Sequence, residues 1–164
     1  MIKILNTLFV TMFGLGRIKT IPGTFGSLAT IIILYIFFHI LDLSSNIILI
    51  GLLIIFTYSF SAIASYIKDN NNKDPKEVVI DEFIGQSIPI CLYEIAHEGT
   101  KETDKVLTFY FIMFILFRIF DIAKPYPVSY YDKNFKNSFG VIMDDVCAGL
   151  YVVAVLVLYM VIFS

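Results

Sequence analysis

Long apolar runs separated by short polar segments dominate the hydropathy pattern of this chain. Four runs, at residues 25–41, 46–67, 106–120 and 146–163, contain no Asp, Glu, Lys or Arg other than Arg118. The second is 22 residues long, and about 20 residues of α-helix cross the hydrocarbon core of a bilayer. A fifth run, 83–93, has only 11 residues. A short span, a re-entrant segment or a buried helix would each explain it.

Composition supports a membrane protein. Of the 164 residues, 58% are hydrophobic and 16% are charged, whereas about a quarter of the residues in a soluble domain are charged. We therefore predict one all-α domain over residues 1–164, an integral membrane helical bundle of four to five hydrophobic helices. Cys91 and Cys147 stand alone in apolar sequence, which predicts small buried side chains and no disulfide.

The first 13 residues predict an amphipathic helix that lies in the membrane interface. They lack the small-residue cleavage site of a signal peptide. Their apolar residues instead recur at helical spacing, at Ile4, Leu5, Leu8, Phe9, Met12 and Phe13.

The distribution of Lys and Arg indicates the topology, because cytoplasmic loops collect these residues. If all five runs cross and the N-terminus is inside, the 12 Lys and Arg residues divide 10 to 2 between the two sides. If the run at 83–93 does not cross, they divide 8 to 4. The pattern favours five crossings, which place all four polar segments described below on the cytoplasmic side.

The first polar segment, 14–26, reads GLGRIKTIPGTFG. Glycine-rich backbone that leads into a helix can approach a phosphate closely, so Arg17, Lys19, Thr24 and Ser27 are candidate substrate-binding residues. The pattern is not a Walker loop, because no Gly-Lys-Ser/Thr follows the glycines. An ordinary interfacial turn that carries cytoplasmic positive charge explains the same residues equally well.

Two pairs of adjacent carboxylates open apolar runs: Asp81 and Glu82, and Asp144 and Asp145. Acidic residues also cap helix N-termini, but ionised carboxylates near the bilayer core cost about 2.5–3.5 kcal/mol each and usually face protein, water or a metal. In Gly85 and Gly149, each pair has a glycine about one turn on, which leaves room for a second helix or a ligand.

The remaining polar segment, 117–127, reads FRIFDIAKPYP. A helix would place Arg118, Asp121 and Lys124 on neighbouring positions of one face before Pro125 stops it. A structural salt bridge between Arg118 and Asp121 would explain that pair and leave Lys124 to be explained.

Together these residues predict a metal-dependent site for phosphoryl chemistry on a lipid headgroup. Five carboxylates at one mouth of the bundle require a cation to stay ionised, and hard oxygen ligands favour Mg²⁺. The expected catalytic and metal-binding residues are Asp81, Glu82, Asp121, Asp144 and Asp145. The expected contacts to the substrate anion come from Arg17, Lys19, Arg118 and Lys124.

The segments GLGRIKTIPGTFGSLA, VVIDEFIG, FRIFDIAKPYP and SFGVIMDDVCAG resemble, in order and approximate spacing, the signatures of the bacterial phosphatidylglycerophosphatase A family. The resemblance runs from about Gly14 to Gly149. It implies a Mg²⁺-dependent enzyme of the bacterial cytoplasmic membrane that removes the terminal phosphate of phosphatidylglycerophosphate. Phe25 and Tyr126 stand where that family typically has Trp.

Other phosphatase designs do not fit this sequence. There is no Cys-x5-Arg loop and no Asp-x-Asp pair, and neither His39 nor His97 lies near a second candidate catalytic residue. We expect a metal-activated water to attack directly, with Asp145 or Glu82 accepting the proton, although a covalent aspartyl intermediate stays open. Rival interpretations are another lipid-phosphate enzyme and a small ion transporter. We expect no nucleic-acid partner, and the sequence does not predict the oligomeric state.

Overall fold

The computed structural model describes residues 2–70, 75–97 and 103–163. In this part of the chain the secondary structure is entirely helical, which confirms the predicted all-α class. Four helical segments are long and apolar enough to cross a membrane: Pro22–Ile40, Ser45–Lys68, Lys105–Ala123 and Ser138–Ile162. Each of the four long apolar runs in the sequence falls largely within one of these segments.

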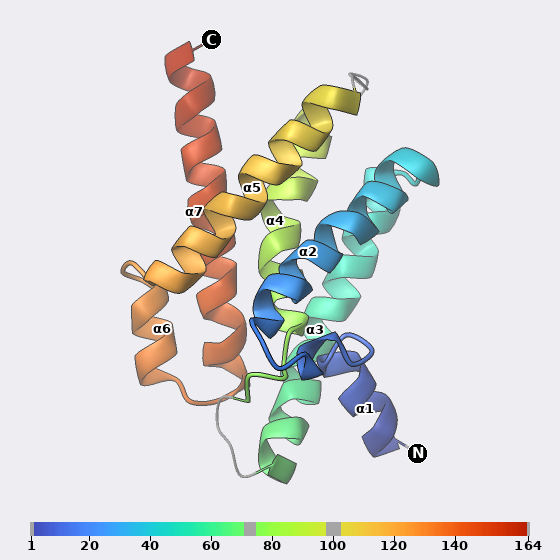
Figure 1. Ribbon diagram of the computed structural model, residues 1–164, viewed down its shortest axis with the longest axis vertical. Helices are drawn as coiled ribbons and strands as arrows, with labels where there is room; N and C mark the ends of the chain where they lie inside the picture. Colours follow the sequence, from blue (N-terminus) through green and yellow to red (C-terminus); the bar gives the residue numbers. More distant parts are fainter. Residues whose placement is uncertain (1, 71–74, 98–102, 164) are drawn as a thin grey trace.

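The bundle is built from five long passes between two ends (Figure 1). Helix α2 (Pro22–Tyr35) continues into a short π-helix, η2 (Ile36–Ile40), and α3 (Ser45–Asn70) returns. Helix α4 (Ile80–Ala96) runs back through the middle, α5 (Thr103–Ala123) returns, and α7 (Ser138–Phe163) makes the last pass. The lower end in Figure 1 carries the loop before α2 and the short helix α6 (Val128–Asn134). Helices α4 and α7 begin in the lower half of the bundle, and the acidic pairs lie in their first two turns.

Helix α4 contains the run at 83–93 that the sequence left ambiguous. It has 17 residues, ten of which are buried between the other helices, so it follows the same path as its neighbours at about 25 Å of length. Protein rather than lipid surrounds most of α4, so the helix tolerates polar side chains. These are Asp81, Glu82, Gln86 and Ser87. This burial explains why its apolar run is the shortest of the five.

The short helices at the N-terminus lie at the lower end. Helix α1 (Ile2–Val10) packs on α3, where the Asn6 side-chain amide donates a hydrogen bond to the Ala62 carbonyl at 3.0 Å. The helix ends at Val10, so Met12 and Phe13 of the predicted stripe lie beyond it, with left-handed φ of 44° and 57°. Met12 is buried, whereas Ile4, Leu5 and Phe13 are exposed. Exposed apolar side chains beside a bundle mouth agree with the predicted interfacial position. The 3-10 helix η1 (Leu15–Arg17) then leads toward α2.

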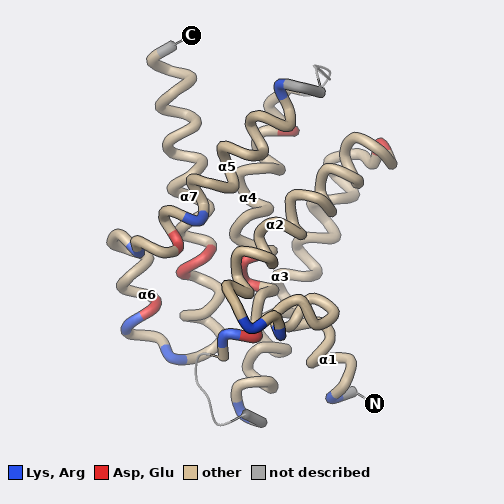
Figure 2. The backbone as a smooth tube through the Cα atoms, in the orientation of Figure 1, with Lys and Arg blue, Asp and Glu red and all other residues tan. Residues whose placement is uncertain are grey.

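Most of the basic residues gather at the lower end (Figure 2). In the described segments, only Lys105, in the first turns of α5, lies at the upper end. The upper end also holds a polar contact in which His39 Nε2 and the Tyr110 hydroxyl lie 3.0 and 2.8 Å from Glu94 Oε1. This contact joins η2, α4 and α5, far from the acidic pairs, as expected for a histidine outside the site.

Candidate active site

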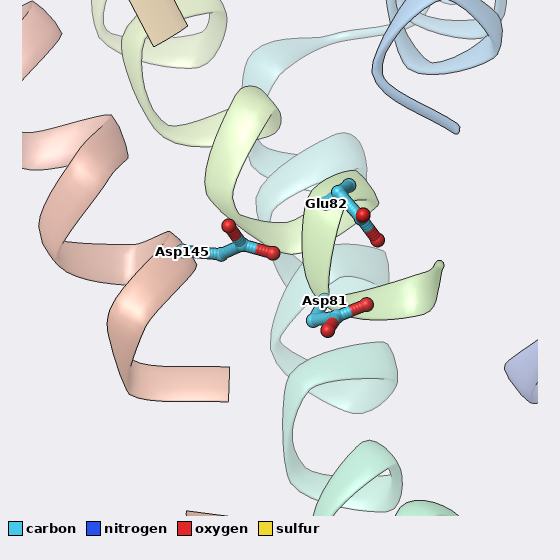
Figure 3. A group of neighbouring side chains, drawn as sticks. All are labelled: Asp81, Glu82 and Asp145. Atoms are coloured by element: carbon cyan, nitrogen blue, oxygen red, sulfur yellow. The ribbon is translucent and has the colours of Figure 1, made fainter. Parts of the chain in front are cut away.

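Three carboxylates from two helices form the centre of the site. Asp81 and Glu82 lie in the first turn of α4, and Asp145 lies in the second turn of α7. One carboxylate oxygen of each residue lies within 4.8 Å of the other two. Figure 3 shows Asp145 reaching from α7 toward the two α4 side chains. Asp81 and Asp145 are only 8% and 3% exposed, so this cluster is withdrawn from solvent.

Two glycines let the two helices approach closely enough to form this cluster. A Cβ atom on Gly85 would lie 2.5 Å from the Asp145 carbonyl oxygen, and a Cβ atom on Gly149 would lie 2.3 Å from the Gly85 carbonyl oxygen. Both distances are far below ordinary van der Waals contact. The prediction that these glycines make room for a second helix is therefore confirmed, and the backbone contact of α4 with α7 fixes the separation of the carboxylates.

The cluster has the chemistry of a divalent-metal site. The Asp81 Oδ1 and Glu82 Oε2 atoms are buried and have no hydrogen-bond partner. Buried carboxylates are costly unless a counter-charge or hydrogen bonds compensate them. Opposite oxygen ligands of Mg²⁺ lie about 4 Å apart, which the 4.8 Å spread of these oxygens accommodates with a small adjustment. The residues present therefore fit a hard cation such as Mg²⁺.

Arg118 links α5 to α2 beside this cluster. Its Nη1 atom lies 2.8 Å from Asp121 Oδ2, so the predicted salt bridge forms. The same atom donates a longer hydrogen bond, 3.4 Å, to the Ser27 hydroxyl. Gly23 provides the space, because a Cβ atom there would lie 2.1 Å from Glu82 Oε1 and 3.3 Å from Arg118 Nη1. The Arg118 Nε–H is buried and unpaired, which leaves one donor of this side chain free.

Lys124 corrects one expectation from the sequence. Helix α5 ends at Ala123, and Lys124 adopts a left-handed φ of 44°, so it does not continue the face that carries Asp121. Its Nζ atom instead donates to Asp132 Oδ1 at 2.7 Å and to Asp144 Oδ2 at 3.0 Å. Burial alone would lower the pKa of Lys124, but these two carboxylates outweigh burial and raise it above its usual value.

A small polar cleft opens beside this lysine. Its volume is about 30 Å³, and α4, α6 and α7 contribute to it. Asp81 of the carboxylate cluster lines the cleft, and so do Asp132 and Asp144, the two partners of Lys124. Lys136 also lines it, with Nζ 4.0 Å from Asp132 Oδ1. The cleft therefore joins the carboxylate cluster to two cations.

Three of the predicted substrate-binding residues are not drawn into these contacts. Arg17 and Lys19 are exposed in the segment before α2, and neither side chain forms a hydrogen bond or ion pair with another described residue. Thr24 is half-buried in the first turn of α2. Of the four candidate substrate-binding residues predicted there, only Ser27 contacts a residue of the site, Arg118. The other predicted residues fall into three adjoining groups: the carboxylate cluster, Arg118 with Asp121, and Lys124 with Asp144.

Sequence reasoning missed three residues near the site. Asp132 and Lys136 lie in and just after α6, and nothing in their spacing marks them as partners of Lys124. Gln86 is completely buried, and neither its Oε1 nor its Nε2 atom has a hydrogen-bond partner. It is four residues after Glu82 and so shares its helix face. A polar residue one turn beyond an acidic pair, inside an apolar run, was the available signal.

The chain is similar in sequence to known proteins over most of its length. Residues 8–160 match the family described as Phosphatidylglycerophosphatase A. A relative of that name from Haemophilus influenzae is 34% identical over 163 residues, which cover 94% of this chain and 89% of the relative. One of the same name from Escherichia coli is 32% identical over 140 residues, covering 84% of this chain and 73% of the relative.

A third relative, from Bacteroides thetaiotaomicron, is named "Putative phosphatidylinositol-3-phosphatase". It is 34% identical over 148 residues, which cover 90% of this chain and 88% of the relative. No solved structure matches the chain. The family match spans nearly the whole bundle, including both glycine-linked carboxylate pairs, and it confirms the resemblance carried by the four motifs: the chain belongs to the phosphatidylglycerophosphatase A family.

Proposed function

We propose that this protein is a Mg²⁺-dependent lipid phosphatase that hydrolyses phosphatidylglycerophosphate to phosphatidylglycerol and inorganic phosphate. The observation that carries the proposal is the buried cluster of Asp81, Glu82 and Asp145, whose oxygens lie within 4.8 Å of one another. In the same cluster, Asp81 Oδ1 and Glu82 Oε2 are buried without a hydrogen-bond partner. The family and the names of two relatives support phosphatidylglycerophosphate as the substrate.

In this proposal the carboxylate cluster holds the metal and the neighbouring cations hold the substrate. Bound Mg²⁺ would withdraw charge from the phosphoryl oxygens and make water more acidic. Lys136 lines the polar cleft, and Lys124 is bonded to two of the acids in its wall. Both attract the phosphate as point charges, and the unpaired Nε–H of Arg118 offers a directed donor. Arg17 and Lys19, which are exposed, serve the approach of the anionic headgroup rather than its final position.

The hydrolysis requires a proton acceptor for the attacking water and a proton for the glycerol oxygen that leaves. A water oxygen attacks phosphorus while the bond from phosphorus to the glycerol oxygen breaks. The water gives up its proton to a carboxylate, for which the unpaired Oε2 of Glu82 is our first choice and Asp145 the second. The glycerol oxygen takes up a proton, either from the carboxyl group protonated in this way or from water, and leaves as the hydroxyl of phosphatidylglycerol. Asp121 keeps Arg118 in place through their 2.8 Å ion pair.

The protein is proposed to span the bacterial inner membrane with its active site on the cytoplasmic face. The support is the charge distribution: the basic residues collect at the end of the bundle that carries the polar cleft (Figure 2). Positive residues favour the cytoplasmic side. In this orientation α1 lies along the cytoplasmic surface and the Glu94 contact lies toward the outer side.

The test is phosphate release by the purified protein in lipid–detergent micelles against three lipids. These are phosphatidylglycerophosphate, phosphatidylinositol 3-phosphate and phosphatidic acid, each with Mg²⁺ or with chelator. We expect Mg²⁺-dependent release, fastest from phosphatidylglycerophosphate. Faster release from phosphatidylinositol 3-phosphate would assign the chain to the activity named for the Bacteroides relative. No release from any of the three lipids would reject a phosphatase function.

A further inference from the structure

An apolar groove runs along the bundle from the carboxylate cluster. Helices α3, α4 and α7 form it, and its volume is about 400 Å³. Leu49 and Phe56 line it from α3, Ile84 and Ile95 from α4, and Val146 from α7. Ser87 supplies a hydroxyl, and that group already donates a hydrogen bond to the Phe83 carbonyl at 2.5 Å. The groove therefore suits a purely hydrocarbon ligand.

One end of this groove lies next to the proposed catalytic carboxylates. Ile84 is three residues after Asp81 and so lies on the same face of α4, and Val146 directly follows Asp145 in α7. From Ile84 to Ile95 the groove follows α4 for 11 residues, which is about 16 Å at the helical rise. Half of a hydrocarbon core is about 15 Å thick. The groove is thus as long as the leaflet that an acyl chain crosses, and it begins where the headgroup would sit.

A second apolar groove has no such connection. It has a volume of about 260 Å³ and lies between α4, α5 and α7, with Pro89, Phe109 and Val157 in its wall. Its α4 residues begin at Pro89, two turns beyond Glu82, and its α7 residues lie between Val153 and Met160. Ordinary membrane lipid can cover it. The backbone contact of α4 with α7 at Gly85 and Gly149 lies between the carboxylates and this second groove.

We propose that one acyl chain of the phospholipid substrate lies in the groove between α3, α4 and α7 during hydrolysis. The proposal rests on the proposed function, because it assigns the tail of the lipid whose headgroup the carboxylates receive. Transfer of a chain from bilayer to groove gains little free energy, since both are apolar. The groove instead orients the lipid, and a misplacement of about 1 Å can reduce turnover about 100-fold.

The first experiment blocks the distant end of the groove and varies the chain length of the substrate. Leu49→Trp fills that end from α3, and Val157→Trp is the matched control in the second groove. For dioleoyl phosphatidylglycerophosphate we expect Leu49→Trp to lower kcat/KM at least tenfold. For the dihexanoyl lipid, whose chains stop short of Leu49, we expect a change of less than twofold. We expect Val157→Trp to keep kcat/KM for both substrates within twofold of the value for the unmodified protein.

If Leu49→Trp lost the same factor in kcat/KM on both substrates, or lost nothing on either, the groove assignment would be overturned. Phosphate release by the unmodified protein would still support the proposed function. The two proposals are separated further by a binding measurement that needs no hydrolysis. A phosphonate analogue of the substrate, with a photoreactive diazirine near the end of one chain, is crosslinked to the unmodified protein with Mg²⁺ present.

Mass spectrometry then locates the attachment. We expect label on α3 near Leu49 and on α4 near Ile95, reduced at least tenfold by an excess of unlabelled analogue. Label concentrated around Val157, or spread over all lipid-facing helices and insensitive to competition, would overturn the proposal. Competed label in the groove of a protein that releases no phosphate would retain the groove as a lipid site and reject only the phosphatase function.

Discussion

Gly85→Ala tests whether the contact between α4 and α7 sets the geometry of the site. The added Cβ atom would lie 2.5 Å from the Asp145 carbonyl oxygen, whereas ordinary contact begins at 3.4 Å. The two helices must therefore separate by about 0.9 Å, because the clash is with backbone rather than with a flexible side chain. The same methyl group would lie 2.8 Å from the ring of Phe117, so sliding toward α5 does not relieve it.

The expected loss follows from this displacement. Extra volume in a packed core costs about 1–3 kcal/mol, while exchanging Gly for Ala inside a helix returns about 1 kcal/mol. We therefore expect stability to fall by at most about 2 kcal/mol, so the protein still folds. Activity should fall more, by about 100-fold, because a shift of about 1 Å in a reacting group has that effect.

The assay is initial phosphate release at saturating Mg²⁺, together with thermal unfolding in the same micelles. Gly51→Ala is the matched control: Gly51 also lies in a membrane-spanning helix, α3, and a Cβ atom there meets nothing within 4 Å. We expect Gly51→Ala to be fully active and slightly more stable. If Gly85→Ala were as active as Gly51→Ala, close approach of α4 and α7 would not determine the site, and this reasoning would be refuted.

Three further predictions concern the lysine pair, the buried amide and the topology. Burial raises the pKa of Asp132, but its pairing with Lys124 outweighs burial and lowers that pKa below its usual 3.8, and the same pairing raises the pKa of Lys124 above its usual 10.5. The stabilisation by this pair should therefore be lost as the pH falls below about 3.8 or rises above about 10.5. The unfolding temperature of Asp132→Asn relative to the unmodified protein, measured across pH, checks this. Gln86→Met should raise the unfolding temperature, because it removes a buried amide whose unpaired atoms cost about 1–3 kcal/mol. The same substitution should lower kcat/KM. A lower unfolding temperature would show instead that the amide stabilises the fold. Single cysteines at Lys105 and Lys133, without Cys91 and Cys147, should react with a membrane-impermeant maleimide from opposite sides, and labelling from one side would reject the five-pass topology.

Local sequence patterns were enough to predict much of the site. Asp145 and Gly149 lie one turn apart on one helix, as Glu82 and Gly85 nearly do, so helical geometry alone relates each carboxylate to its glycine. Long uncharged runs likewise predicted the four lipid-facing helices, because surrounding lipid requires apolar side chains along the whole length. The motifs of the four polar segments added the family.

Features that depend on tertiary structure were not accessible in this way. Lys124 pairs with Asp132 and Asp144 rather than with Asp121, because the chain leaves the helix at Ala123 and α6 folds back beside α7. Helical spacing cannot predict that turn. Helix α4 was ambiguous for a related reason: its neighbours rather than lipid cover it, so burial permits the polar residues that shorten its apolar run.

The central claim is that Asp81, Glu82 and Asp145 together hold the metal on which hydrolysis depends. Its most direct test is phosphate release from phosphatidylglycerophosphate as a function of Mg²⁺ concentration for Asp145→Asn. Glu94→Gln is the control, since it neutralises a carboxylate on α4 at the other end of the bundle. We expect Asp145→Asn to lose about 100-fold or more in turnover and to require more Mg²⁺, while Glu94→Gln keeps the unmodified Mg²⁺ dependence. Equal Mg²⁺ dependence and near-normal turnover for Asp145→Asn would contradict the account.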